Sequence, residues 1–387
     1  MRFIFKTDYN QDLRLLKHSG YWWSYGALAA LLIFAPFGLD NYLVSQLVFV
    51  FIYALVGVSL TILTGFTGQV SLGHAAFLAI GAYTAGFLQS IGVPFILYFP
   101  AAAIITGLVG MLVAIPALRL SGIYLVIATI AFGFIIEEVA ARWEDVTHGN
   151  EGMRVRTIDV FGESVGLTLP RDEPGFYFLC LGILVLMIVV ALNLARTPTG
   201  RAFMAIRDSE TAAKSMGVNL ALYKVKSFTI SAAITGMAGV LFAHKLSFIS
   251  PEMFTLLLSL EFIMVIIIGG IIGLHGAVLG AIFIVMIDPF LTLLKDDVPG
   301  LVTSLALLFG VAQETASSMG NAIGNVGSAP GMKGALYGLI IIFFIIFEPY
   351  GLYGRWLKVK LYFQLFPLYK KATFKRQKTY VKSERNR

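Results

Sequence analysis

RTPTGRAFMAIRDSETAAKSMGVNLALYKVK, residues 196–226, is the longest charged, helix-forming segment between apolar runs of membrane quality. Its basic residues are Arg196, Arg201, Arg207, Lys214, Lys224 and Lys226, and its acidic residues are Asp208 and Glu210. Segments that connect membrane helices on the cytoplasmic side carry an excess of Lys and Arg. The segment is therefore predicted to be cytoplasmic.

The middle of this segment predicts a short amphipathic helix. Ser209 is a suitable N-cap, Glu210–Met216 is rich in helix-forming residues, and Gly217 is a suitable C-terminal stop. Two interpretations are open for such a helix. It is either a surface helix that lies among lipid headgroups or a coupling element that docks into a separate motor subunit.

The composition is that of an integral membrane protein, since 58% of the 387 residues are hydrophobic and only 13% are charged. The net charge of +7 comes largely from the end of the chain, where 355–387 holds eleven Lys and Arg against Glu384 alone. Basic residues next to a membrane helix attract anionic lipid, so membrane lipid is an expected partner and nucleic acid is not. The single cysteine, Cys180, lies in an apolar run, which excludes a disulfide framework and a cysteine-based metal site.

About ten apolar runs are long enough, or nearly so, to cross a bilayer. They lie near 21–39, 42–64, 70–91, 95–117, 121–140, 175–195, 226–248, 255–271, 277–294 and 334–350. We therefore expect an all-α, polytopic transmembrane helical bundle over 21–356. The runs 255–271 and 277–294 are joined by the tight turn Gly273–Gly276, so a re-entrant pair is an open alternative there.

Span parity and charge predict the same topology. Residues 1–20 form a basic N-terminal tail, predicted to be cytoplasmic and followed by an uncleaved first span. Parity then puts the 196–226 loop and the basic tail 357–387 in the cytoplasm as well. It puts the acid-rich loop 141–174 and the loop 295–333 on the outer side, so both termini are expected to be cytoplasmic.

Two kinds of residue within the runs point to a pathway. Glycines that break membrane helices often line one, and the candidates here are Gly65 and Gly68, followed by Gln69, Ser71 and His74. For His74 the simpler interpretation is a packed histidine. Ionisable residues inside spans must face water or find a partner, which adds Glu261 and Asp288 to the candidates.

Motifs for chemistry are lacking in the sequence. There is no GxxxxGK[ST] phosphate loop, and the histidines His18, His74, His148, His244 and His275 share no metal-ligand spacing. No Ser/His/Asp constellation can be assembled from spans this apolar. The chain is therefore predicted not to be an enzyme and to bind neither a metal nor a cofactor of its own.

Four stretches together resemble a known family, the inner-membrane permease subunits of branched-chain amino acid ABC importers. They are GFTGQVSLGHAAFLAIGAY (Gly65–Tyr83), LRLSGIYLVIATIAFG (Leu118–Gly133), AIRDSETAAKSMGVNLALYKVKSFTISAAITGMAGVLFA (Ala205–Ala243) and FEPYGLYGRW (Phe347–Trp356). The likeness covers about 65–290 and 334–356. The loop 295–333 lies outside it and is expected to be longer than the family's connection.

The resemblance implies a role for the 196–226 loop. Permeases of ABC importers carry a cytoplasmic E-A-A-x-x-x-G loop that binds in a groove of the ATPase. Here Thr211, Ala212, Ala213 and Gly217 fit the spacing, with threonine first and Glu210 one residue early. Together with Arg207 these are the coupling-loop residues that the resemblance implies.

The same resemblance implies partners and a substrate class. The expected partners are a second homologous permease subunit, two ATPase subunits that bind the ATP, and a periplasmic binding protein. The implied function is a translocation pathway for branched-chain or related amino acids across the bacterial inner membrane, with urea or short amides as the alternative within the family. A stand-alone channel or ion-coupled transporter is the alternative from another class, which Glu261 and Asp288 would suit. A membrane scaffold without a pathway is a third.

Overall fold

The chain folds into an all-α structure, as predicted. The computed structural model describes residues 19–120, 122–160, 168–170, 174–271, 273–296, 300, 303–304, 313, 315, 317–318, 332–348 and 350–365. The α-helices of the first half are α2 (Ser19–Gly38), α3 (Asn41–Leu60), α4 (His74–Ser90), α5 (Phe95–Ala117), α6 (Ile123–Arg142), α7 (Glu144–Thr147) and α8 (Pro174–Arg196). Those of the second half are α9 (Pro198–Asp208), α10 (Glu210–Ser215), α11 (Leu220–Leu246), α12 (Leu256–Gly269), α13 (Leu274–Val285), α14 (Ile287–Asp296), α17 (Met332–Phe347) and α18 (Gly351–Leu365).

Shorter elements join these helices. A π-helix, η1 (Thr61–Phe66), continues α3, and the 3₁₀ turns are η2 (Gly149–Glu151) and η3 (Pro251–Met253). Strands β1 (Met153–Arg154) and β4 (Phe248–Ile249) pair antiparallel, with Met153 opposite Ile249, and β2 (Ile158–Asp159) pairs with β3 (Thr168–Leu169). The β1–β4 pair fastens the predicted outer loop to the end of α11.

Six helices are long and apolar enough to cross a membrane: Asn41–Phe66, α5, α6, α8, α11 and Pro251–Gly269. Two more apolar helices, Trp23–Gly38 and Leu274–Phe290, are shorter. The described residues thus show six to eight membrane helices. The prediction of about ten spans also counts α4 and α17, each of which coincides with a predicted run.

One predicted span is not a continuous helix. Over 277–294 the structure has α13 and α14, which are separated at Met286. Pro289 has no N–H to donate to the carbonyl of Val285, four residues earlier, and Val285 is the last residue of α13. With 12 residues α13 rises only about 18 Å. The predicted run 277–294 thus corresponds to two successive helices, and the predicted turn Gly273–Gly276 overlaps the first turn of α13, which begins at Leu274.

The centre of the bundle is formed by α3 and α11. In their apolar stretches 83% and 67% of the residues are buried, against 17% in α6 and in α8, which face outward. Small residues let α11 approach its neighbours, because a Cβ at Gly81 of α4 would overlap the carbonyl oxygen of Gly236 and one at Gly110 of α5 would overlap Ala232. Close backbone contact is thus what holds α4, α5 and α11 together.

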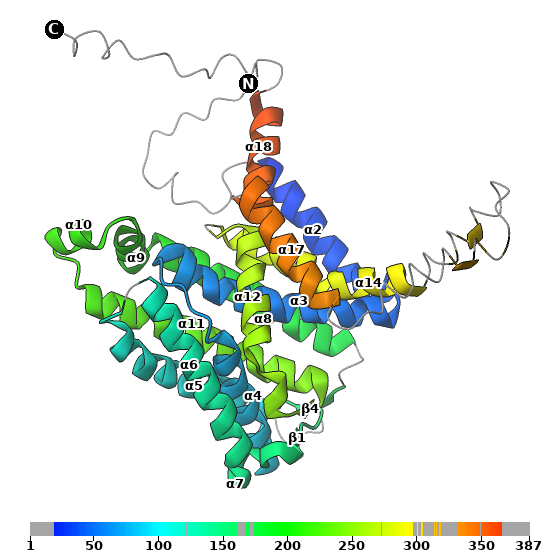
Figure 1. Cartoon of the computed structure of the whole chain (residues 1–387), viewed down its shortest axis with the longest axis horizontal. Coiled ribbons are helices and arrows are strands. Elements are labelled where there is room, and N and C mark those ends of the chain that lie inside the picture. The colour runs from blue at the N-terminus through cyan, green and yellow to red at the C-terminus, as the bar shows by residue number, and fades with distance from the viewer. Residues whose placement is uncertain are drawn as a thin grey trace.

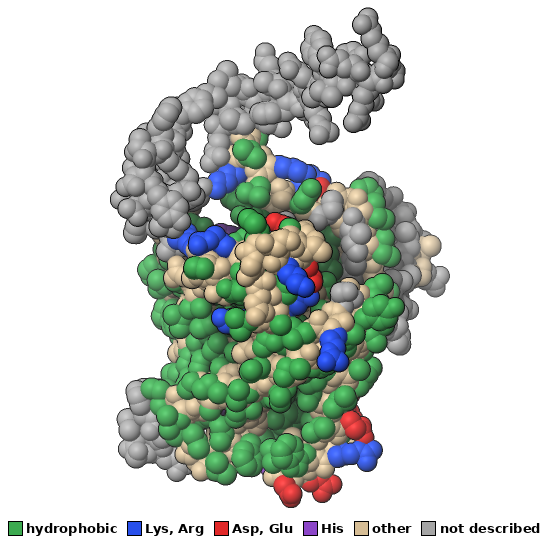
Figure 2. Space-filling model, turned by 90° about the vertical axis from the view of Figure 1, so that its left-hand side faces the viewer, with side chains coloured by type: hydrophobic (Ala, Val, Ile, Leu, Met, Phe, Trp, Pro, Cys, Tyr) green, Lys and Arg blue, Asp and Glu red, His purple; other side chains and the backbone are tan. Residues whose placement is uncertain are grey.

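The two ends of the molecule differ in charge and content. Figure 1 places α9, α10 and α18 in its upper part and α7, β1 and β4 at the lower end. Figure 2 shows most Lys and Arg in the upper part of one face, a broad hydrophobic zone beneath them, and acidic side chains with Lys or Arg beside them at the lower edge. The segments predicted to lie on opposite sides of a membrane are therefore at opposite ends of the fold.

Three predicted segments fall wholly or mostly outside the described residues. They are the tail 1–20 as far as His18, the greater part of the loop 295–333, and the tail beyond Leu365. The described part of 357–387 continues α18.

Candidate functional site

The 196–226 segment folds into two short helices and the start of a third. Thr197 caps α9 by accepting a hydrogen bond from the Gly200 amide, and Ser209 caps α10 by accepting one from the Ala212 amide. Gly217 has φ +83°, a left-handed conformation that ends α10. The prediction of a helix capped by Ser209 and stopped at Gly217 is confirmed.

Residues of α10 divide into an inward and an outward set. Ala213 is buried, and the Glu210 carboxylate lies 2.7 Å from the ammonium of Lys224, a lysine of α11 whose side chain is 9% exposed. Thr211 and Ala212 are exposed, and Met216 at the tip is 86% exposed. The helix is therefore fixed to α11 on one side and presents a small, partly apolar surface on the other.

Thr211 stands where the E-A-A pattern has glutamate, and the structure shows what each of the two residues does. The hydroxyl of Thr211 lies 3.0 Å from that of Ser209, next to the cap of α10. Glu210 meanwhile points toward Lys224. The acidic residue one position early thus serves as an internal anchor of the loop.

Arg207, at the end of α9, reaches the first glycine cluster. Its Nη1 donates a hydrogen bond to the carbonyl oxygen of Gly65 at 3.0 Å, although 142 residues separate the two in sequence. Gly68 has φ +74°, and a Cβ there would lie 3.2 Å from Cγ of Arg207. Two groups of residues that the sequence suggested separately, the coupling loop and the glycine turn, are in contact.

The first glycine turn also touches the second. A Cβ at Gly65 would overlap the carbonyl oxygen of Ile271, in the turn between α12 and α13. That turn is itself tightly packed, since a Cβ at Gly269 would overlap the carbonyl oxygen of Gly276. The two clusters therefore meet end to end beneath α9.

Three further pathway candidates are buried between helices. The Nε2 of His74 lies 2.9 Å from the hydroxyl of Ser231, which donates to the carbonyl of Ser59. The amide of Gly73 donates to the Ser71 hydroxyl at the start of α4. Gln69 is buried as well, and among the residues that the structure describes its side-chain oxygen and Nδ1 of His74 have no hydrogen-bond partner. His74 is thus buried with Nε2 hydrogen-bonded to Ser231, while Nδ1 is left to bind a further polar group.

The two acidic candidates lie in different surroundings. Glu261 of α12 is buried and accepts a hydrogen bond of 2.8 Å from the Tyr53 hydroxyl of α3. Asp288 is exposed in α14, the helix that leads toward the right-hand edge of Figure 1. Asp288 therefore differs from the buried candidates in being exposed, beyond the break at Met286.

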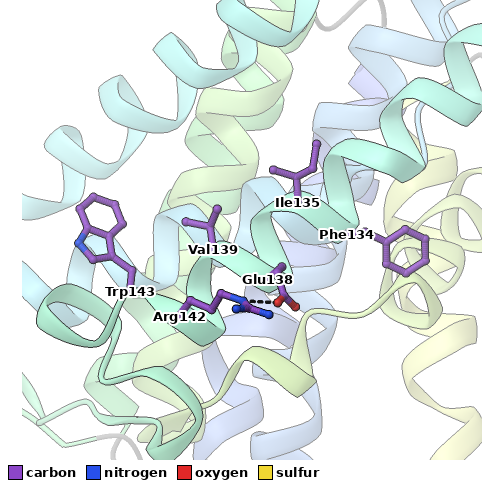
Figure 3. Close-up of a pocket in the computed structure, with 6 residues that line it drawn as sticks. All are labelled: Phe134, Ile135, Glu138, Val139, Arg142 and Trp143. Atoms are coloured by element: carbon purple, nitrogen blue, oxygen red, sulfur yellow. Dashed lines mark hydrogen bonds and ion pairs between the residues drawn. The ribbon is translucent and has the colours of Figure 1, made fainter.

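A hollow of about 560 Å³ lies on the outside of α6. Figure 3 shows its lining of Phe134, Ile135, Glu138, Val139, Arg142 and Trp143, with Glu138 and Arg142 joined by an ion pair one helical turn apart. The lining is mostly apolar and comes from the end of this one helix and the residue after it. None of the predicted pathway residues contributes to it.

Sequence reasoning did not single out Tyr53, Ser231 or Lys224 as site residues. Tyr53 and Ser231 lie in apolar runs and carry no local signal. Lys224 was counted only for its charge, because its partner Glu210 lies in another helix, beyond the turn at Gly217. Within the described ranges there is no group of three or more His, Cys, Asp or Glu side chains that could hold a metal ion.

Comparison with known proteins agrees with the four motifs. Residues 42–345 match the family described as "Branched-chain amino acid transport system / permease component". The chain is 34% identical over 282 residues to the high-affinity branched-chain amino acid transport system permease protein LivM of Escherichia coli K12 and 33% identical to its counterpart in Salmonella typhimurium. Each alignment covers 67% of this chain and 66% of the relative.

A more distant likeness involves the autoinducer 2 import system permease protein LsrC of Salmonella paratyphi B, 33% identical over 138 residues, which are 33% of this chain and 40% of the relative. No solved structure matches. The family match spans most of the chain, including every described helix from α3 to α14. This chain belongs to the family of branched-chain amino acid transport system permease components.

Proposed function

We propose that this chain is a transmembrane permease subunit of an ABC importer, forming the translocation pathway for branched-chain or related amino acids. A second, homologous permease completes the pathway, two ATPase subunits drive it, and a periplasmic binding protein delivers the substrate. The two LivM relatives are permeases of branched-chain amino acid transport systems, which supports the substrate class. The complex works in the bacterial inner membrane, with about ten spans and both termini in the cytoplasm.

The observation that carries this proposal is the construction of α10. A methionine that is 86% exposed, Met216, lies at the tip of a helix at the basic end of the molecule. The opposite side of the same helix is held by the Glu210–Lys224 ion pair. A rigidly held helix with an exposed apolar tip is suited to bind in a groove of another protein and to transmit its movement.

A stand-alone transporter is less well supported. That alternative drew on Glu261 and Asp288 as intramembrane charges, whereas Glu261 is buried against Tyr53 and Asp288 is exposed in α14. A stand-alone transporter also gives no role to the exposed tip of α10. Urea and short amides remain the alternative substrates within the family.

The test is reconstitution with ATPase subunits, a second permease and a binding protein from the same organism. We expect Met216→Asp to reduce co-purification of the ATPase and stimulated ATP hydrolysis together, because a charge replaces the apolar tip. Met216→Leu preserves an apolar side chain of similar size and should retain recruitment. Equal recruitment by both variants would show that α10 is a surface helix, and the permease proposal would lose its main support.

A further inference from the structure

One contact links the loop 196–226 to the membrane helices at the point where a central helix is irregular. The π-helix η1 ends at Phe66, so the carbonyl of Gly65 is among those that a helix end leaves without an internal donor. Arg207 supplies that donor through Nη1 at 3.0 Å. π-Helical turns within α-helices occur frequently at functional sites.

The guanidinium of Arg207 is held in place from its own side of the contact. Its Nε and Nη2 donate to Oδ1 of Asp208, at 3.1 and 2.9 Å. The remaining Nη1 is thereby directed at Gly65. Because the guanidinium is planar and its donors have a fixed geometry, a lysine could not make both sets of bonds at once.

Packing reinforces the hydrogen bond. The main chain of Arg207 lies directly over Gly68, where a Cβ would be 3.5 Å from Cα of Arg207. Gly65 on its other side abuts the carbonyl of Ile271. The helix α9, the π-turn and the α12–α13 turn are thus in continuous contact, through the Arg207 side chain on one side of Gly65 and the main chain of Ile271 on the other.

We expect α9 to move together with α10, because the connection between the two helices is short and hydrogen-bonded. Only Ser209 separates the two helices, and its amide donates to the carbonyl of Ala205 in α9 while its hydroxyl caps α10. The Glu210–Lys224 pair adds a second fastening. A displacement at the tip of α10 therefore reaches Arg207 before it reaches any membrane helix other than α11.

We infer that Arg207 is a positioning residue that transmits nucleotide-driven movement of α9 and α10 to the π-turn of α3 and to the glycine turns at Gly65 and Ile271. The inference rests on the proposed function, since it requires an ATPase that moves α10. Arg207 contacts neither the substrate nor the nucleotide. It acts by moving the Gly65 carbonyl and the backbone around it.

The experiment compares Arg207→Gln with Arg201→Gln in the complete complex, reconstituted in proteoliposomes with leucine as substrate. Arg201 is the matched control, because it is an exposed arginine of the same helix whose Nη1 donates to the carbonyl of Arg196, the last residue of α8 and only five positions earlier in the chain. A hydrogen bond to a charged group is strong enough to change an equilibrium by about tenfold or more. We therefore expect Arg207→Gln to lower the leucine transported per ATP hydrolysed by about tenfold, with the ATPase still bound. Arg201→Gln should leave this ratio as in the parent chain.

A second measurement distinguishes transmission from a merely structural contact. Val70, 40% exposed and two residues beyond Gly68, is changed to cysteine in a Cys180→Ser background, which leaves one cysteine in the chain. Its maleimide labelling rate is compared between the nucleotide-free and the vanadate-trapped complex. The rate should depend on nucleotide when Arg207 is present and should no longer do so in Arg207→Gln.

The outcomes separate the two proposals. If the parent chain does not bind the ATPase, the proposed function fails. If the parent chain couples normally and Arg207→Gln shows the same transport ratio and the same nucleotide-dependent labelling, the inference about Arg207 is wrong and the proposed function stands. Loss of ATPase binding in Arg207→Gln alone would also overturn it, because Arg207 would then be part of the docking surface.

Discussion

At the scale of single residues, two polar contacts define how the 196–226 loop is held. Glu210 pairs with Lys224, whose side chain is almost fully buried, and Arg207 bonds the carbonyl of Gly65. The first contact explains why the acidic residue stands one position before the place where the E-A-A pattern has it. From there its carboxylate reaches α11, and Thr211 can remain beside the cap at Ser209.

Removing one partner of the Glu210–Lys224 pair should loosen α10. A half-exposed carboxylate is partly screened, so we expect Glu210→Ala to destabilise the docked position of α10 by about 1–2 kcal/mol, less than a fully buried pair would cost. Hydrogen exchange at the α10 amides should accelerate. The double variant Glu210→Ala/Lys224→Met should recover much of the protection, since no buried charge is left without its partner. Equal exchange in Glu210→Ala and the parent chain would show that the pair contributes nothing.

At the scale of elements, close glycine contacts decide which helices pack together. Lipid tails are as apolar as leucine, so association of membrane helices depends on close packing. The α4–α11 crossing shows this, because a Cβ at Gly239 would overlap the carbonyl oxygen of Leu78 and one at Gly81 would overlap that of Gly236. The crossing leaves no room for a methyl group at either position.

Gly81→Ala should therefore separate α4 from α11, although alanine is the better helix former. Overpacking of this kind costs about 1–3 kcal/mol. Gly182→Ala in α8 is the matched control, because a Cβ there meets nothing within 4 Å. Thermal unfolding in detergent should begin at a lower temperature for Gly81→Ala and at the same or a higher temperature for Gly182→Ala. The crossing would be less tight than described if the two variants melted alike.

At the scale of the whole molecule, the basic and acidic ends support one orientation in the membrane. The exposed Met216 lies at the end that carries most Lys and Arg on the face seen in Figure 2, and Glu151 lies beside α7 at the other end. The positive-inside rule assigns the first end to the cytoplasm. The proposed roles of the ATPase and of the binding protein both depend on this assignment.

Cysteine labelling tests the orientation directly. In a Cys180→Ser background expressed without the ATPase, a membrane-impermeant maleimide added to spheroplasts should label Glu151→Cys and should label Met216→Cys only after permeabilisation. Both positions are exposed in the fold, so accessibility depends on the side of the membrane alone. The reverse pattern would contradict the topology and the role of α10 together.

Features set by neighbouring residues could be predicted from the sequence. Hydropathy determined the class of protein and the places of most helices, since a span must be apolar along about 20 residues wherever it packs. Ser209 and Gly217 determined the limits of α10, because capping and left-handed turns involve residues only a few positions apart. Pro289 is a local signal for the interruption between α13 and α14 at Met286, within the predicted span 277–294.

Contacts between distant helices were decided only by the tertiary structure. The pairs are Arg207 with Gly65, His74 with Ser231 and Glu261 with Tyr53, separated by 142, 157 and 208 residues. Hydropathy cannot rank the faces of helices that are apolar all round, so it does not say which face of α3 meets α12 or α11. The sequence alone therefore determined a membrane protein with a capped helix over Glu210–Ser215, while the tertiary structure decided that α9, through Arg207, rests on the π-turn that continues α3, because that contact joins residues far apart in the chain.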